Sequence, residues 1–275
     1  MIELARVNIA AVPAESVQDN FGLLMPPSVW DRSMLVMSLA HRGSFIEAVE
    51  YNAEAMRLAE STHNLTTIGM ALRGASTLHL VKGSWREARS VIDRFVKTAA
   101  GIHHPYAVAC HAWALAQLGE GCEALASIHE GEQLIEHQAR SGVVAGHNWA
   151  YYALGRACLV LARLDEAQRL GQRCLETAKL FSAHALDLLG NIAIHRERIG
   201  AGTGDVCFHK VLEIGAPRGL RPLVASGHLG LGTLLRMTDK SDEAREHLTT
   251  ASTLYREMDM PYWLQKAEAE LGRLR

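Results

Sequence analysis

One short phrase recurs along the chain and limits the possible folds more than any other feature. After a short polar break, a new helical stretch opens with a polar or charged pair that leads to a small residue. The small residues mark the register of the copies. In chain order they are Ala48, Ala88, Ala124, Ala167, Val206 and Ala244, of which the copy at Val206 is the weakest. Successive marks lie 40, 36, 43, 39 and 38 residues apart. Periods of this size are typical of stacked helical repeats.

Each period contains two helical stretches. Leu154, Cys158 and Leu161 recur at the spacing of one helix face, and after a break Leu170 and Cys174 continue the pattern in a second helix. No segment alternates apolar and polar residues over a useful length, so strands are not expected. The sequence therefore predicts an all-α fold made of helix pairs.

Composition narrows the class of protein. The 275 residues are 48% hydrophobic and 21% charged, enough apolar material for a sizeable core. With 28 basic and 30 acidic residues the net charge is −2, which disfavours nucleic-acid binding. No apolar run approaches the roughly 18 residues that cross a bilayer, and no secretory leader is visible. We therefore expect a soluble, cytoplasmic protein with no membrane or nucleic-acid partner.

The reactive residue types do not form a recognisable site. The five cysteines are widely spaced without a CxxC pair, so we expect them to pack as small apolar side chains in a reducing compartment. The 14 histidines include no HExxH motif, and neither a GxSxG nor a GxxxxGK[ST] run occurs. The sequence predicts no enzyme, no cofactor and no metal site.

Small residues fall where two helices of a pair must approach closely. The copies that show this best contain Tyr151, Leu154-Gly155, Ala167, Leu170 and Cys174, and then Leu231-Gly232, Leu235, Ala244, Leu248 and Ala251. This pattern resembles the tetratricopeptide repeat, although Val36 and Ser76 replace its glycine in earlier copies. The resemblance implies a right-handed α-solenoid of about six tetratricopeptide-like helix pairs. Residues 27–275 would form the repeat domain, and residues 1–26 an N-terminal helical or linker segment.

The chain also carries a closer resemblance, with matching phrases over nearly its whole length. The phrases Leu154-Gly-Arg-Ala157, Arg163-Leu-Asp-Glu-Ala-Gln-Arg-Leu170 and Tyr255-Arg-Glu-Met-Asp-Met-Pro-Tyr-Trp-Leu264 resemble the C-terminal repeat region of bacterial signalling proteins. Those proteins join an adenylate or guanylate cyclase domain to a P-loop ATPase domain. Neither set of catalytic motifs occurs here, so the resemblance implies at most a regulatory or sensory tail, whose partner would be the catalytic domains of the same parent protein.

The tetratricopeptide resemblance also indicates which side chains line the concave groove. Counting positions two, five and nine of each first helix gives a set rich in aromatic and charged residues: Arg73, Tyr106, Trp113, Trp149, Tyr152, Arg156, His184, Asp187 and Asn191. Aromatic anchors with a few charges are typical of recognition surfaces, so we expect a protein or peptide segment to bind there.

Simpler interpretations of the same residues stay open. Trp113 and Trp149 could fill space between helices, and Arg156 with Asp187 could form an ordinary ion pair between repeats. An autonomous small-molecule sensor is a further alternative. After the last pair, the stretch that begins at Pro261 predicts a terminal capping helix that faces solvent and packs on the final pair through its two aromatic residues.

Overall fold

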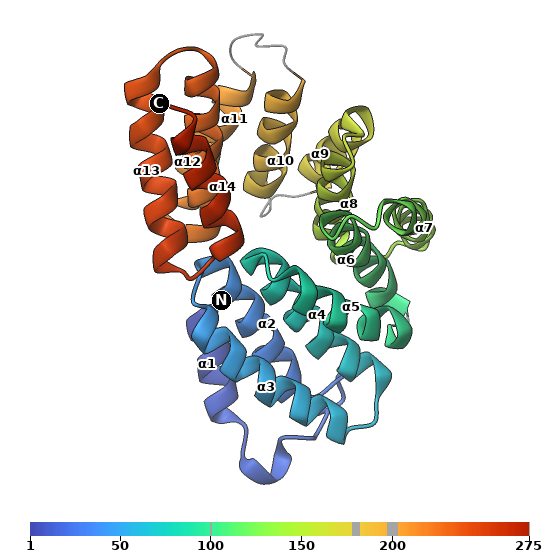
Figure 1. The fold of residues 1–275 in the computed structure, drawn as a ribbon. Helices are drawn as coiled ribbons and strands as arrows, with labels where there is room; N and C mark the ends of the chain where they lie inside the picture. The colour runs from blue at the N-terminus through green and yellow to red at the C-terminus, as the bar shows by residue number, and fades with distance from the viewer. Residues whose placement is uncertain (100, 178–181, 197–202, 275) are drawn as a thin grey trace.

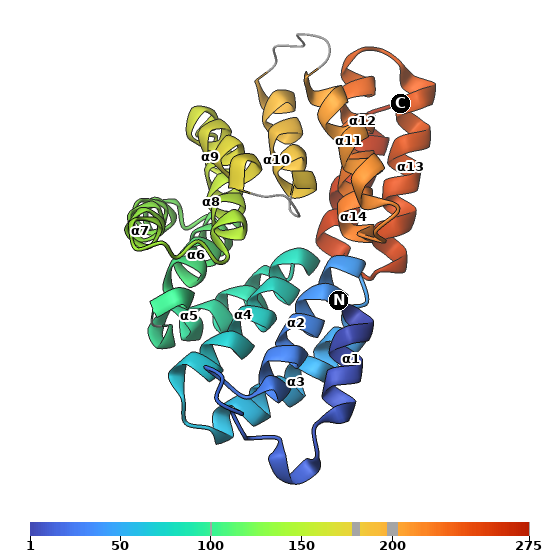
Figure 2. The same ribbon diagram turned by 180° about the vertical axis from the view of Figure 1, so that it is seen from behind.

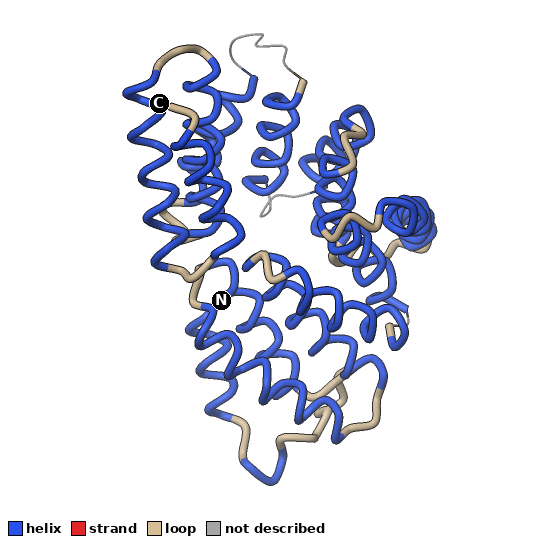
Figure 3. The backbone as a smooth tube through the Cα atoms, in the orientation of Figure 1, coloured by secondary structure: helices blue, strands red, loops and turns tan. Residues whose placement is uncertain are grey.

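The computed structural model describes residues 1–99, 101–177, 182–196 and 203–274. Within these ranges the chain forms fourteen α-helices and two short 3-10 turns, and no strand occurs (Figure 3). The helices are α1 (Ile2–Ala11), α2 (Pro27–Arg42), α3 (Phe45–Ser61), α4 (Leu65–Lys82), α5 (Trp85–Thr98), α6 (His104–Gln117), α7 (Gly121–Arg140), α8 (His147–Val160), α9 (Leu164–Thr177), α10 (Ser182–His195), α11 (Thr203–Gly215), α12 (Arg221–Met237), α13 (Ser241–Glu257) and α14 (Pro261–Gly272).

The helices pack as six consecutive neighbouring pairs, from α2 with α3 to α12 with α13. The first helices of the pairs, α2, α4, α6, α8, α10 and α12, also pack on one another in chain order and form an inner layer. The second helices lie on the outer side of the curve (Figures 1 and 2). The prediction of an all-α fold of helix pairs is confirmed.

The array bends until its two ends meet. Helix α12 packs against α2, and one apolar core joins side chains of α1, α2 and α3 with those of α12, α13 and α14 (Figure 1). Across the same junction the Lys82 ammonium lies 2.9 Å from a carboxylate oxygen of Asp259, and the Tyr262 hydroxyl donates to Gln117 at 2.6 Å. We call this junction the seam. It closes the inner layer into a ring.

The terminal helix α14 caps the last pair and also makes contacts beyond it. It packs on α13 as expected, but its aromatic residues also reach across the seam to Trp85 of α5. A helix that packed only on the last pair would leave these aromatic rings exposed to water. The expectation that α14 packs on the final pair with its charged residues in solvent is confirmed, since Lys266 and Glu268 are exposed. The additional contacts arise because the curvature of the array brings the first pairs to the same place.

The alanine marks occupy the tightest points of the helix pairs. All five marking alanines are fully buried, each at the fourth position of the second helix of its pair. Gly232 on the facing first helix α12 allows the same close approach, since a Cβ there would lie 2.5 Å from Leu248 and 3.2 Å from the backbone oxygen of Ala244. The sixth mark was wrong: Val206 is 48% exposed, and the next residue, Cys207, is buried instead. In this pair Phe208 fills the space, and two glycines of α10 and α12 make room for its ring.

The segment before the first pair belongs to the same folded body. Helix α1 packs on α2, and Ala5 is buried in the core that the two ends of the array share. Arg6 pairs with Glu47 of α3 at 2.5 Å. The residues between α1 and α2 pack less closely, and Phe21, Leu23 and Leu24 are exposed. Over the described part of the chain, no helix combines the length and apolar character needed to cross a membrane.

Candidate functional site

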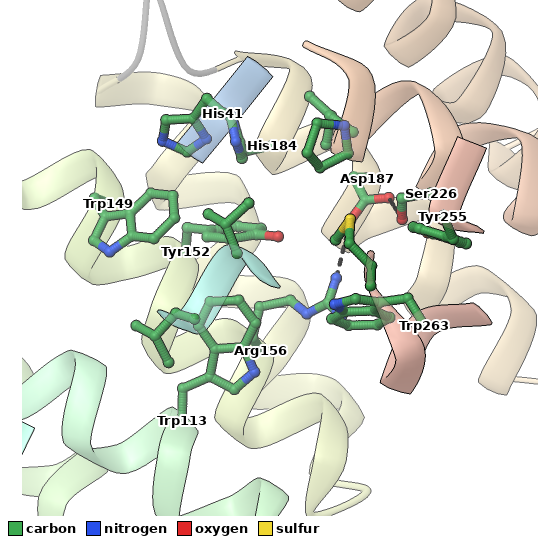
Figure 4. A pocket seen from close by; sticks show the side chains of 15 residues that line it. His41, Trp113, Trp149, Tyr152, Arg156, His184, Asp187, Ser226, Tyr255 and Trp263 are labelled. Atoms are coloured by element: carbon green, nitrogen blue, oxygen red, sulfur yellow. Dashed lines mark hydrogen bonds and ion pairs between the residues drawn. The ribbon is translucent and has the colours of Figure 1, made fainter. Parts of the chain in front are cut away.

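The inner helices converge on one cavity of about 50 Å³ (Figure 4). Every inner helix contributes at least one lining side chain, and α13 and α14 complete the wall. We call this cavity the central chamber; its lining residues are His41, Leu80, Val81, Trp113, Trp149, Tyr152, Arg156, His184, Asp187, Pro222, Leu223, Ser226, Tyr255, Met260 and Trp263. The chamber is mostly apolar; its polar side chains include Arg156, His184, Asp187 and Ser226 on α8, α10 and α12, and His41 on α2.

A buried ion pair crosses the chamber from α8 to α10. A guanidinium nitrogen (Nη1) of Arg156 lies 2.9 Å from Oδ2 of Asp187, and only 9% and 1% of the two side chains is exposed. The other carboxylate oxygen of Asp187 accepts the Ser226 hydroxyl at 2.6 Å and the Asn191 amide at 3.3 Å. Both oxygens of the carboxylate are therefore hydrogen-bonded, as a buried charge requires.

Three aromatic rings surround the guanidinium of Arg156. Its central carbon lies 5.4 Å from the ring centre of Trp113, 5.9 Å from that of Tyr152 and 5.6 Å from that of Trp263 (Figure 4). These distances fall in the range of cation–π attraction. The rings come from α6, α8 and α14, so three separate helices fix the position of this one cation. Its Nε nitrogen is buried without an acceptor among the described residues.

Burial shifts the pKa values of the titratable side chains that line the chamber. It lowers the pKa of His41 to about 4, and it lowers that of His184 well below the usual value, with His41 and Arg156 adding to the effect. Burial also raises the pKa of Asp187, although Arg156 and the hydroxyl of Ser226 act in the opposite direction. At neutral pH both imidazoles are uncharged, and the cation of Arg156 is matched by the carboxylate of Asp187 beside it.

Six of the nine residues predicted to face the groove line the central chamber: Trp113, Trp149, Tyr152, Arg156, His184 and Asp187. Asn191 lies behind them and donates to Asp187. The ion pair that the simpler interpretation expected is therefore present, and Trp113 and Trp149 are both buried, at 2% and 3% exposure.

The remaining two predicted residues form a smaller group beside the chamber. The guanidinium carbon of Arg73 lies 4.1 Å from the ring centre of Tyr106, and the Tyr106 hydroxyl is 2.6 Å from the hydroxyl of Thr77. The ring of Tyr106 stacks on that of Trp149 at 6.4 Å, which connects this group to the chamber. The nine predicted residues are thus linked in one network of contacts, with Arg73 and Tyr106 at its edge.

The sequence prediction missed several chamber residues. Trp263 and Tyr255 enter because the ring closes, and His41 enters from the C-terminal end of α2. Position counting within a repeat could not find Trp263, since α14 is not part of a pair. The adjacent aromatic residues at the start of α14 were a visible signal, but they were assigned to packing on the last pair alone.

The comparisons with known proteins give no family. No protein-family model matches the sequence. Nor does any curated protein match it. Within the described residues, no group of three or more histidine, cysteine, aspartate or glutamate side chains is arranged to hold a metal ion. Any assignment of function therefore rests on the geometry of the chamber and on the resemblances in the sequence.

Proposed function

We propose that the chain is a non-enzymatic interaction module, a right-handed tetratricopeptide-like solenoid that binds a protein or peptide segment on its concave inner face. One observation carries the proposal: all six inner helices direct side chains to a single chamber where a buried ion pair lies inside an aromatic cage. Tryptophan, tyrosine and arginine are the residues that most often dominate binding energy at protein interfaces.

The energetic cost of the buried ion pair indicates a role in binding more than a role in stability. Two charges removed from water cost several kcal/mol each, and well-packed apolar residues of the same volume often stabilise a fold as much or more. The chamber also holds hydrogen-bond donors with no acceptor in the described chain, the Nε of Arg156 and the indole N–H of Trp113. A carbonyl or carboxylate oxygen of a bound segment would satisfy such donors.

The size of the chamber indicates how a segment would bind. Its volume of about 50 Å³ is far below the roughly 300–1,000 Å³ of ordinary ligand pockets. It holds a few water molecules or one small chemical group. A segment therefore binds either with a single group inserted or after the ring opens at the seam, where α14 forms the wall.

Capture of partners from lysate of the native organism, followed by titration of the partner found, tests the proposal. We expect alanine at Trp113, Tyr152 and Arg156 to weaken binding at least about tenfold, the scale of one hot-spot side chain. Arg140→Ala is the matched control, because that side chain is 80% exposed on the outer helix α7. If the triple variant stays folded and binds every captured partner as the wild type does, the groove is not the binding site.

The resemblance to cyclase and ATPase signalling proteins supports a second candidate, a regulatory or sensory tail that acts inside such a protein. The supporting observation is the set of matching phrases from Leu154 to Leu264. The test is genomic: an upstream reading frame that continues into this chain with cyclase or P-loop motifs supports this candidate. A native start codon at Met1 together with a native stop codon contradicts it.

A further inference from the structure

The inner face already has an occupant, the chain's own last helix. Tyr262 and Trp263 stand side by side at the start of α14 and both face the seam. The ring of Tyr262 meets Trp85 edge-on at 5.2 Å, and its hydroxyl donates to Gln117 at 2.6 Å. Trp263 lies 6.0 Å from Trp85 and caps the guanidinium of Arg156. These are the contacts that an anchoring aromatic pair of a bound helix would make.

The surface that receives this pair comes from helices far away in the sequence. We call it the receptor cleft, formed by Gly83, Trp85, Trp113, Gln117 and Arg156. Gly83 follows α4 with a φ of +82°, and a Cβ at this position would lie 2.7 Å from the indole nitrogen of Trp263. The absence of a side chain at Gly83 therefore leaves the room that the indole fills.

Helix α14 is also held less firmly than the inner helices of the array. Ala267 is its only fully buried residue, whereas each inner helix packs between two neighbouring inner helices. A short turn joins α14 to α13, and Asp259 in that turn has a φ of +52°, which a residue with a side chain adopts at some cost. The ion pair of Lys82 with this same Asp259, whose side chain is 83% exposed, is a surface pair and adds little to the stability of the junction.

We propose that α14 is an exchangeable occupant of the receptor cleft, and that the partner is an amphipathic helix with two adjacent aromatic residues that replaces it. This rests on the proposed function and names its partner class. Binding of a helix in a groove through aromatic anchors is a common recognition mode. The tethered helix competes at a high effective concentration, so the free cleft is a minor state and the partner must displace α14.

The test uses the full-length chain with its own anchors removed. In the variant Tyr262→Ala/Trp263→Ala, α14 stays attached but no longer fills the cleft. The probe is a labelled synthetic peptide of residues 258–273, added in trans and followed by fluorescence anisotropy. We expect the peptide to bind this variant at least about tenfold more tightly than it binds the wild type, whose cleft is filled. A peptide with both aromatics replaced by alanine should bind neither protein.

Glu268→Ala provides a matched control in the same helix, since that carboxylate pairs with Arg256 at the exposed surface and leaves the aromatic pair in place. The control variant should bind the peptide as weakly as the wild type does. Equal binding to all three proteins overturns the proposal, because the peptide site would then lie elsewhere. A folded double variant, judged by circular dichroism, that binds no peptide also overturns it.

If the double variant does not fold, the single variant Trp263→Ala with free indole as the probe decides the question. Indole should raise the Tm of this variant and leave that of the wild type unchanged, and no rise in the variant overturns the proposal. These outcomes are separate from the test of the proposed function. A chain that loses its captured partner on mutation of the chamber, but never binds the α14 peptide, retains the proposed function without this partner class.

Discussion

Replacing Arg156 by methionine removes the chamber's cation while keeping a side chain of similar length. Asp187 is then left as an unpaired carboxylate with 1% of its side chain exposed. Loss of one partner of a buried ion pair lowers the free energy of unfolding by about 3–5 kcal/mol. In a chain of this size each kcal/mol shifts Tm by about 2 °C, so we expect Tm to fall by about 6–10 °C.

The double variant Arg156→Met/Asp187→Leu distinguishes the contribution of the two charges from that of the volume their side chains fill. With both charges replaced by apolar groups, we expect stability within about 1–2 kcal/mol of the wild type, well above either single variant. Ser226 loses its acceptor, but its hydroxyl can bond to a backbone carbonyl one turn earlier, as those of Ser76 and Ser252 do. Thermal denaturation of the wild type, the two single variants Arg156→Met and Asp187→Leu, and the double variant completes a double-mutant cycle.

The pH dependence of the single variant checks the same reasoning. Burial already raises the pKa of Asp187 above its ordinary 3.8, and removal of Arg156 raises it further. A carboxyl with a raised pKa in the folded state destabilises the fold at pH values above that pKa and no longer does so below the unfolded value. The Tm gap between Arg156→Met and the wild type should therefore narrow as the pH falls from 7 towards 4. A Tm gap that stays constant with pH refutes an electrostatic coupling between the two residues. So does a double variant whose loss of unfolding free energy equals the sum of the losses in the two single variants.

Three further predictions follow from burial and backbone geometry. Because burial lowers the pKa of His41 and of His103 to about 4, the unfolded chain binds protons that the folded chain does not; Tm should stay level above pH 6.5 and fall between pH 6.5 and 4, as calorimetry can show. Cys122 is the one exposed thiol of the five, so a thiol reagent should label one equivalent rapidly and the rest only on unfolding. Gly83→Ala should lower Tm more than Gly119→Ala, since both glycines have φ above +80° but only the first faces the tryptophan of α14.

Features that depend on contacts within one helix pair could be predicted from the sequence. The alanine marks are such features, because two helices that cross closely require a small side chain at the crossing, whatever lies further along the chain. The groove positions are of the same kind. Counting positions in single repeats identified Trp113, Arg156 and Asp187, and the inner helices bring all three to one chamber. The wrong prediction at Val206 has the same basis. In that pair the ring of Phe208 fills the space between the helices, so no small residue is needed at the fourth position of the second helix.

Closure of the ring is a different kind of property. It depends on the sum of small rotations between successive pairs, and repeats of 36 to 43 residues do not fix that sum in the sequence. A slightly wider curve would leave Trp263 in water and the chamber open. The seam that prevents this combines the apolar core shared by the two ends with the packing of α12 on α2, the aromatic contacts of α14, one hydrogen bond and one exposed ion pair. Closure thus depends on contacts between the two ends of the array and also shapes the chamber, and a partner helix must outcompete α14 to reach the inner face.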